Sequence, residues 1–103
     1  MDYKISITDL AAQDLESIAI YLTEKLHNPT AASAFLDAVN DYYEKLTVMP
    51  LMFEQCRDPR LRDLGYRRIV IKNYLLIYRI AEAEHTVYIL RFFHGSQNYE
   101  KWI

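Results

Sequence analysis

Three runs of β-branched and aromatic residues in the second half of the chain constrain its fold most. They span residues 66–71, 74–80 and 87–94, and short polar stretches separate them. Runs of this composition and length, bounded by polar breaks, predict an antiparallel meander. Because almost everything upstream has a helical pattern, we expect this meander to be the sheet that the helices cover.

The first half of the chain predicts a short strand and then two helices. Apolar and polar residues alternate over residues 3–7, as in a half-buried strand. Apolar residues then recur every three or four positions over about 9–26 and again over 29–49, which predicts two amphipathic helices. Thr8 and Asn28 are suited to cap their N-termini. The short break between the helices predicts an antiparallel hairpin.

The remaining segments have no clean period. Residues 50–65 predict a loop with about one turn of helix, and residues 95–103 predict a helical turn or a loose end. At 103 residues the chain is expected to be one domain, 1–103. The predicted fold class is therefore α+β, with an N-terminal strand and an antiparallel helical hairpin packed on a small antiparallel β-sheet.

Cysteine content and hydropathy predict the compartment. Cys56 is the single cysteine, so no internal disulfide forms, and one idle thiol fits a reducing environment. No run reaches the roughly 18–20 apolar residues that a membrane-spanning helix needs. The first residues lack the basic and apolar regions of a signal peptide. We expect a cytoplasmic protein with no membrane contact.

Charge is unevenly distributed along the chain. The net charge is −2 overall, but residues 1–50 carry −5 and residues 51–103 carry +3. Within 57–79, seven basic residues stand against two acidic ones, which makes a local positive patch. Such a patch can dock a phosphate or an acidic partner, although several solvated arginines would give the same pattern.

The turns of the meander predict its register. A two-residue turn at 72–73, and a second turn in the polar stretch that follows residue 80, place Leu75 opposite Phe92 and Arg79 opposite Tyr88. The second turn is longer, so this register can shift by one residue. Both faces of the sheet are then largely apolar. We expect one face to meet the helical hairpin and the other to meet a partner or the C-terminal tail.

Sequence motifs exclude several kinds of chemistry. The chain contains no P-loop, GxGxxG, GxSxG or HExxH motif, and with two glycines it has no phosphate-cradling loop. His27 is expected near a helix C-terminus, where it favours the helix dipole, and no second ligand stands at metal-binding spacing from it. The sequence therefore predicts no metal and no cofactor.

Arginines, tyrosines and a histidine on the sheet are the remaining candidates for chemistry. Arg68 or Arg79 could stabilise the charge of a phosphorane, and His94 and Tyr99 could serve as acid or base in RNA cleavage. The alternative is structural: His94 ends the sheet, and Arg79 pairs with nearby glutamates. The predicted register also separates Arg79 from His94 by roughly 20 Å, which is too far for one active site.

The order of elements and three short segments resemble a known family. The segments are Gly65-Tyr66-Arg67-Arg68, Asn73-Tyr74-Leu75-Leu76-Ile77-Tyr78-Arg79-Ile80 and Ile89-Leu90-Arg91-Phe92-Phe93-His94-Gly95-Ser96. Together with the upstream strand, helical hairpin and proline-containing loop, they resemble the RelE/ParE toxin superfamily of bacterial type II toxin–antitoxin (plasmid stabilisation) systems. The resemblance implies a toxin and growth inhibitor that a co-expressed antitoxin holds inactive.

The superfamily has two branches, and three features favour the ParE-like one. RelE-like members cut mRNA on the ribosome, whereas ParE-like members inhibit DNA gyrase without nuclease activity. In the nucleases an arginine usually stands where this chain has Leu75, and those proteins are strongly basic, whereas this chain has a pI of about 5.9. The segment 89–94 with its small polar tail also looks like the end of a ParE strand. Against this, Tyr99 lies near a terminal acid–base tyrosine of some nucleases.

Two functions therefore stay open at this point, with a decayed, non-toxic relative as a third option. The favoured prediction is a gyrase-binding toxin without catalytic residues. The alternative is an mRNA endonuclease, an mRNA interferase acting with the ribosome, whose active groups include Arg68, Arg79, His94 and Tyr99. The expected partner is a cognate antitoxin. The chain is expected to form a homodimer or a hetero-oligomer with that antitoxin. The residues predicted to contact the target or the antitoxin are Leu22, Phe35, Arg67, Arg68, Arg91, Phe92, Phe93 and His94.

Overall fold

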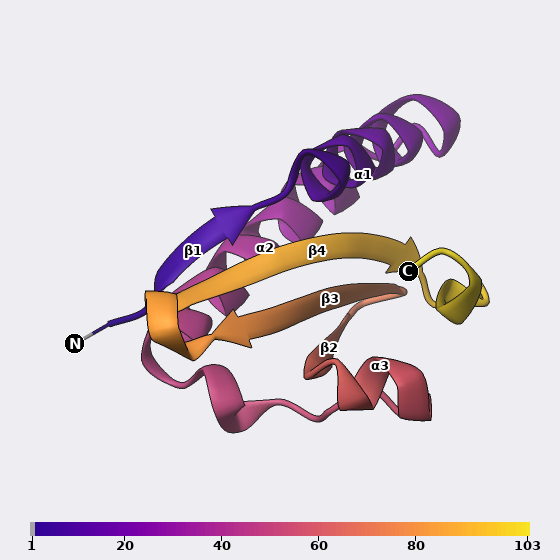
Figure 1. Cartoon of the computed structure of the whole chain (residues 1–103). Helices are drawn as coiled ribbons and strands as arrows, with labels where there is room; N and C mark the ends of the chain where they lie inside the picture. The colour runs from indigo at the N-terminus through magenta and orange to yellow at the C-terminus, as the bar shows by residue number, and fades with distance from the viewer. Residues whose placement is uncertain (1) are drawn as a thin grey trace.

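A four-stranded sheet with a helical hairpin on one face makes up the fold (Figure 1). The computed structural model describes residues 2–103. Its strands and α-helices, in chain order, are β1 (Lys4–Ile7), α1 (Asp9–Ile20), α2 (Pro29–Val48), α3 (Pro59–Asp63), β2 (Tyr66–Ile71), β3 (Tyr74–Ala81) and β4 (Thr86–His94). The predicted α+β class is confirmed. No helix in the described part of the chain is long and apolar enough to span a membrane.

The two helices begin where their capping residues predict. The Thr8 hydroxyl accepts a hydrogen bond from the Ala11 N–H at 3.1 Å, and the Asn28 side chain accepts one from the Ala31 N–H at 3.0 Å. The first helix was expected to run to about residue 26, but its α-helical part ends at Ile20 and a π-helical turn, Tyr21–Lys25, continues it. A left-handed residue, His27 (φ 48°), then reverses the chain.

Strand order makes the sheet mixed instead of purely antiparallel. The order is β1-β4-β3-β2, and β1 pairs with β4 in parallel. The β2–β3–β4 meander is antiparallel as predicted. A parallel pair needs a long crossover, and here the chain passes through both long helices, α3, β2 and β3 before it returns in β4 beside β1. The sequence predicted β1 but not its partner.

A β-bulge in β4 changes the register along half of the sheet. Arg79 lies opposite Tyr88, as predicted, but Leu75 lies opposite Phe93, so the predicted Leu75–Phe92 pair is wrong. The shift falls at Leu90, the extra residue between the pairs Tyr78–Ile89 and Ile77–Arg91. One extra residue reverses the faces of everything beyond it. As a result Phe92 faces the helices and Phe93 faces the opposite side.

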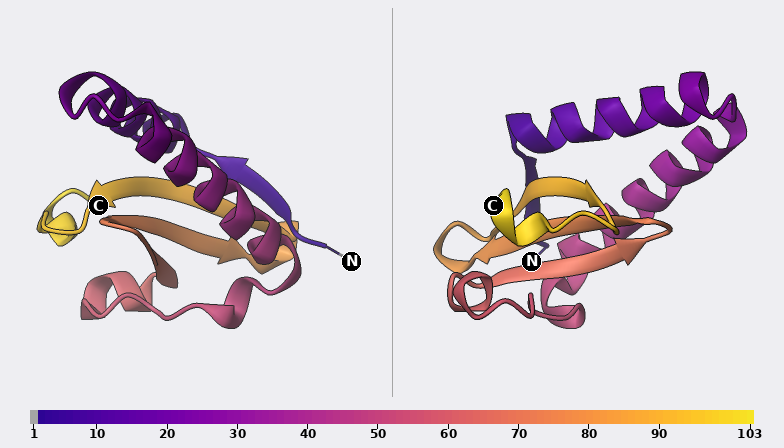
Figure 2. Two further views of the ribbon diagram at one scale, coloured as in Figure 1. Left: turned by 180° about the vertical axis from the view of Figure 1, so that it is seen from behind. Right: turned by 90° about the vertical axis from the view of Figure 1, so that its right-hand side faces the viewer.

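Both faces of the sheet are covered by the chain itself. In Figure 2, left, α2 crosses one face. The core there includes Phe35, Leu76, Tyr78 and Phe92. A second core lies on the opposite face, where α3, the loop before it and the C-terminal tail pack on the strands; its buried members are Cys56, Leu61, Leu75, Ile77, Phe93 and Tyr99. The expectation that the tail meets this face is confirmed.

Candidate functional site

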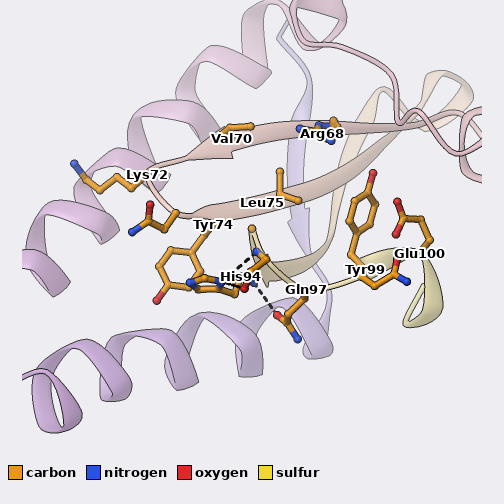
Figure 3. A pocket seen from close by; sticks show the side chains of 13 residues that line it. Arg68, Val70, Lys72, Tyr74, Leu75, His94, Gln97, Tyr99 and Glu100 are labelled. Atoms are coloured by element: carbon orange, nitrogen blue, oxygen red, sulfur yellow. Dashed lines mark hydrogen bonds between the residues drawn. The ribbon is translucent and has the colours of Figure 1, made fainter.

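A pocket of about 610 Å³ lies at the end of the sheet where β4 gives way to the tail (Figure 3). Strand β2, the start of β3 and residues 94–100 form its walls. The pocket collects three of the four residues that the sequence nominated for chemistry, namely Arg68, His94 and Tyr99. The three come from β2, the last residue of β4 and the tail, so only the folded chain brings them together.

Arg68 reaches the pocket from β2, but its charge is already countered. Its Nε lies 3.0 Å from Glu54 Oε1, and its side chain is 17% exposed. Within residues 2–103 this Nε has no hydrogen-bond partner. The contact with Glu54 is therefore an ion pair and not a hydrogen bond. An arginine neutralised in this way is poorly suited to stabilise new negative charge on a phosphate.

His94 is exposed, and local bonds fix its ring. The Ser96 N–H donates to His94 Nδ1 at 3.2 Å, and the Ser96 hydroxyl lies 2.6 Å from the same nitrogen. With Nδ1 accepting, the neutral ring carries its proton on Nε2, a tautomer assigned from these bonds. The ring also packs edge-on against Tyr74, 5.4 Å between centroids. His94 is thus a rigid and accessible group.

Tyr99 lies in the second core and is 5% exposed. Burial raises the pKa of its hydroxyl, and the neighbouring Cys56 adds to this, while the nearby Arg68 acts to lower it. A phenol with a raised pKa stays protonated at neutral pH, so Tyr99 is not a base. Its ring packs 6.0 Å from that of Phe93, and it anchors the tail.

Arg79, the fourth nominated residue, lies outside the pocket. It is near the other end of β3, opposite Tyr88, and its guanidinium lies 4.4 Å from the centre of the Tyr88 ring. As an alternative to catalysis, the sequence suggested that Arg79 pairs with a glutamate of the following turn. In the structure its guanidinium instead makes this cation–π contact with Tyr88. Distance therefore excludes Arg79 from any site around His94, as the register predicted.

The floor of the pocket is apolar and its rim is polar. Leu75 lies on the floor and is 5% exposed. Lys72 lies at the rim, exposed and left-handed (φ 54°) in the turn. No cluster of three or more potential metal ligands occurs within the described residues. The hollow thus joins an apolar floor to a polar rim.

Four of the eight predicted partner contacts are buried. Leu22, Phe35, Phe92 and Phe93 are 1–8% exposed and belong to the two cores, so their side chains are not at the surface of the folded chain. Leu22 and Phe35 lie on the apolar stripe that the helices turn towards the sheet. Phe92 and Phe93 lie on opposite faces of β4, and each face is covered by one of the two cores. Of the eight predicted positions, only His94 is exposed.

The remaining predicted arginines hold the structure together. Arg67 donates to the Phe53 carbonyl at 2.6 Å. Arg91 donates from Nε to Asp14 at 2.7 Å and from Nη2 to the same carboxylate at 3.1 Å, and Asp14 also accepts the Phe92 N–H at 3.0 Å. Sequence reasoning missed Asp14, although its position beside the apolar stripe of the first helix was the available signal.

A second, smaller pocket lies on the other side of His94. It measures about 310 Å³ and is bounded by α1 and the ends of β3 and β4. His94, Tyr74 and Gln97 line both hollows. His94 therefore separates two adjacent depressions on one end of the molecule.

Comparison with known proteins agrees with this architecture. Residues 5–99 match the family model "ParE toxin of type II toxin-antitoxin system, parDE". Among solved structures, the fold is similar to the toxin–antitoxin complex RelBE2 from Mycobacterium tuberculosis (TM-score 0.64, 25% identity, 91% of this chain and 99% of that one). No curated protein sequence matches the chain.

Two further structures share the fold at lower identity. One is the chromosomal ParDE system from P. aeruginosa, with TM-score 0.69, 19% identity, and coverage of 89% of this chain and 95% of that one. The other is the archaeal RelE–RelB complex from Pyrococcus horikoshii OT3, with TM-score 0.61, 17% identity, and coverage of 94% and 99%. Since the family model spans nearly the whole domain, the chain belongs to the ParE toxin family of type II toxin–antitoxin systems, within the RelE/ParE superfamily.

Proposed function

We propose that this toxin inhibits DNA gyrase by binding it through the surface around His94, without chemistry of its own. The observation that carries the proposal is the state of Arg68. It is the arginine that lines the pocket with His94, and Glu54 lies 3.0 Å from its Nε. A site that cleaves RNA needs an available cation for the developing charge.

The other groups of the pocket support binding over catalysis. Leu75 gives the pocket an apolar floor, and the raised pKa of Tyr99 removes it as a base. His94 remains as an exposed aromatic group between two depressions. A fixed ring flanked by hollows resembles the anchors that dominate binding energy in protein interfaces.

We also propose that a cognate antitoxin neutralises the toxin. One of the similar structures is described as the toxin–antitoxin complex RelBE2, and another as a RelE–RelB complex. The whole-length match to a ParE family model supports the same arrangement for this chain.

A supercoiling assay with purified gyrase tests the proposed target. Wild-type toxin is expected to inhibit supercoiling, and His94→Ala is expected to need at least about tenfold more protein for half inhibition, about 1.4 kcal/mol of lost binding. His27→Asn is the matched control, because His27 is also exposed and asparagine tolerates its left-handed backbone. Wild-type toxin that leaves supercoiling intact would refute the gyrase target.

One observation favours the second candidate, a ribosome-dependent mRNA endonuclease. Arg68, His94 and Tyr99 line one pocket, which is the grouping that such chemistry would need. In a reconstituted translation mixture, the binding proposal predicts intact mRNA after toxin addition. Cleavage that His94→Gln and Tyr99→Phe both abolish would establish the nuclease instead.

A further inference from the structure

An apolar patch lies at the C-terminal end of α2, far along the chain from the pocket around His94. It consists of Val48, Met49, Leu51 and Met52, which are 64%, 57%, 62% and 52% exposed. Two adjoining hollows, of about 420 and 380 Å³, share three of these residues. Large apolar side chains are usually buried, and methionine is over-represented on surfaces that accept apolar partners because its side chain adapts. We call these four residues the α2-end patch.

The backbone beneath the α2-end patch is fixed by the core. The buried hydroxyl of Tyr78 donates to the Pro50 carbonyl at 2.6 Å, and Pro50 itself is buried. The Met49 N–H donates to the Lys45 carbonyl at 2.8 Å, and the Met52 N–H donates to the Met49 carbonyl at 3.1 Å. The apolar side chains are thus presented on a fixed backbone. A surface that is already ordered loses less conformational entropy when a partner binds.

Acidic side chains border the patch on one side. Asp41 and Glu44, both exposed on α2, line the larger hollow. The one basic residue that lines it, Lys45, lies over the Tyr42 ring, with Nζ 5.0 Å from the centroid. The first half of the chain also has a net charge of −5. An apolar surface with a carboxylate border is complementary to a segment that carries apolar side chains beside lysines or arginines.

We propose that the α2-end patch docks a basic, amphipathic segment of the cognate antitoxin; the inference rests on the proposed antitoxin partner. A second copy of this chain is a poorer occupant. A two-fold dimer through this patch would bring the carboxylates of one copy towards those of the other, because such an interface uses the same surface twice. The charge of the border thus favours a partner of opposite sign.

Affinity for the antitoxin encoded with this chain tests the proposal. Met52→Glu places a charge within the patch and is expected to weaken binding at least tenfold by titration calorimetry. Leu64→Glu is the matched control, because Leu64 is 55% exposed and lies at the end of α3, and it is expected to change the dissociation constant less than twofold. The double substitution Asp41→Lys, Glu44→Lys is expected to weaken binding and to reduce its dependence on salt.

Circular dichroism and the thermal midpoint establish that each variant is folded. Unchanged affinity of folded Met52→Glu and of folded Asp41→Lys, Glu44→Lys would overturn the proposal. A light-scattering result in which the toxin alone is a dimer, and Met52→Glu dissociates that dimer, would also overturn it.

Gyrase inhibition without antitoxin is a separate readout, and it is expected to be equal for wild type and Met52→Glu. Failure of the gyrase proposal is therefore distinguishable from failure of this one. A wild-type toxin that binds no antitoxin would overturn the antitoxin partner and this docking site together.

Discussion

At the scale of single residues, two tyrosines show how the same group acts differently in different surroundings. Burial raises the pKa of both Tyr43 and Tyr78 to about 12. The Tyr78 hydroxyl donates to the Pro50 carbonyl, whereas the buried Tyr43 hydroxyl has no hydrogen-bond partner within the described chain. A buried polar group without a partner is costly, and one with a partner is favourable.

We predict opposite effects on stability for Tyr43→Phe and Tyr78→Phe. Tyr43→Phe removes an unsatisfied hydroxyl and should raise the free energy of unfolding by about 0.5–1.5 kcal/mol, whereas Tyr78→Phe should lower it by about 1–2 kcal/mol because the Pro50 carbonyl loses its donor. Urea unfolding at pH 7 measures both, and each variant is the other's control. Equal changes in the same direction would contradict the assignment.

The same tyrosines predict how stability depends on alkaline pH. In the unfolded chain a tyrosine ionises near its usual pKa of about 10, whereas the native hydroxyls hold their protons to about 12. Ionisation of these tyrosines therefore leaves the stability unchanged below about pH 10 and lowers it as the pH rises towards 12, because the unfolded chain loses its protons first. The loss is about 1.4 kcal/mol per pH unit for each group. Tyr43→Phe should make the decline in stability between pH 10 and 12 measurably shallower; an unchanged slope would contradict this.

At the scale of elements, the bulge in β4 decides which residues reach which core. Leu90 is the extra residue, and beyond it Phe92 faces the hairpin while Phe93 faces Tyr99. The Phe92 N–H and the Arg91 side chain both meet Asp14 on α1. The bulge therefore positions the end of the strand against the first helix as well as against the tail.

We predict that deleting Leu90 unfolds the domain or lowers its stability by more than about 3 kcal/mol, because the deletion exchanges the faces of Phe92 and Phe93 and separates Arg91 from Asp14. Leu90→Ala keeps the chain length, and Leu90 is only partly buried, so this control should cost about 1 kcal/mol. Thermal unfolding followed by circular dichroism measures both variants. A deletion variant as stable as Leu90→Ala would show that the register is not decisive.

At the scale of the whole molecule, the sheet separates two cores of different construction. The first is closed by the long helices, and the second by α3 and the tail. The tail is held by Tyr99 and by Arg60, which donates to the carbonyls of Glu100 and Ile103 at 2.9 and 3.2 Å. Cys56, 1% exposed, lies in this second core, and burial raises the pKa of its thiol.

Labelling of Cys56 reports how often the second core opens. We predict that the native protein reacts with a thiol reagent at least about 100-fold more slowly than the denatured chain, because the thiolate is the reactive form and it is both disfavoured and covered. Tyr99→Ala should increase the labelling rate, since it removes the anchor of the tail. The control Trp102→Ala, at a residue 63% exposed in the same tail, should leave the rate unchanged. Equal rates for both variants would refute the role of Tyr99.

The local structure could be predicted from the order of residues alone. Capping at Thr8 and Asn28, the apolar repeats of the helices and the turn at 72–73 depend on neighbours within a few residues, so the printed order of residues was enough to place them. The resemblance of the three strand segments also determined the superfamily, which the match over residues 5–99 confirms at the level of the ParE toxin family.

Which residues line the pocket depends on contacts between distant parts of the chain. The parallel pairing of β1, the bulge at Leu90 and the ion pair of Arg68 with Glu54 join segments from different parts of the fold, and no local period encodes them. For this reason the predicted contacts Phe35 and Phe92 proved to be core residues, while His94 stayed exposed. Side-chain exposure depends on what packs against an element in three dimensions, and a single-residue shift in register is sufficient to reverse it.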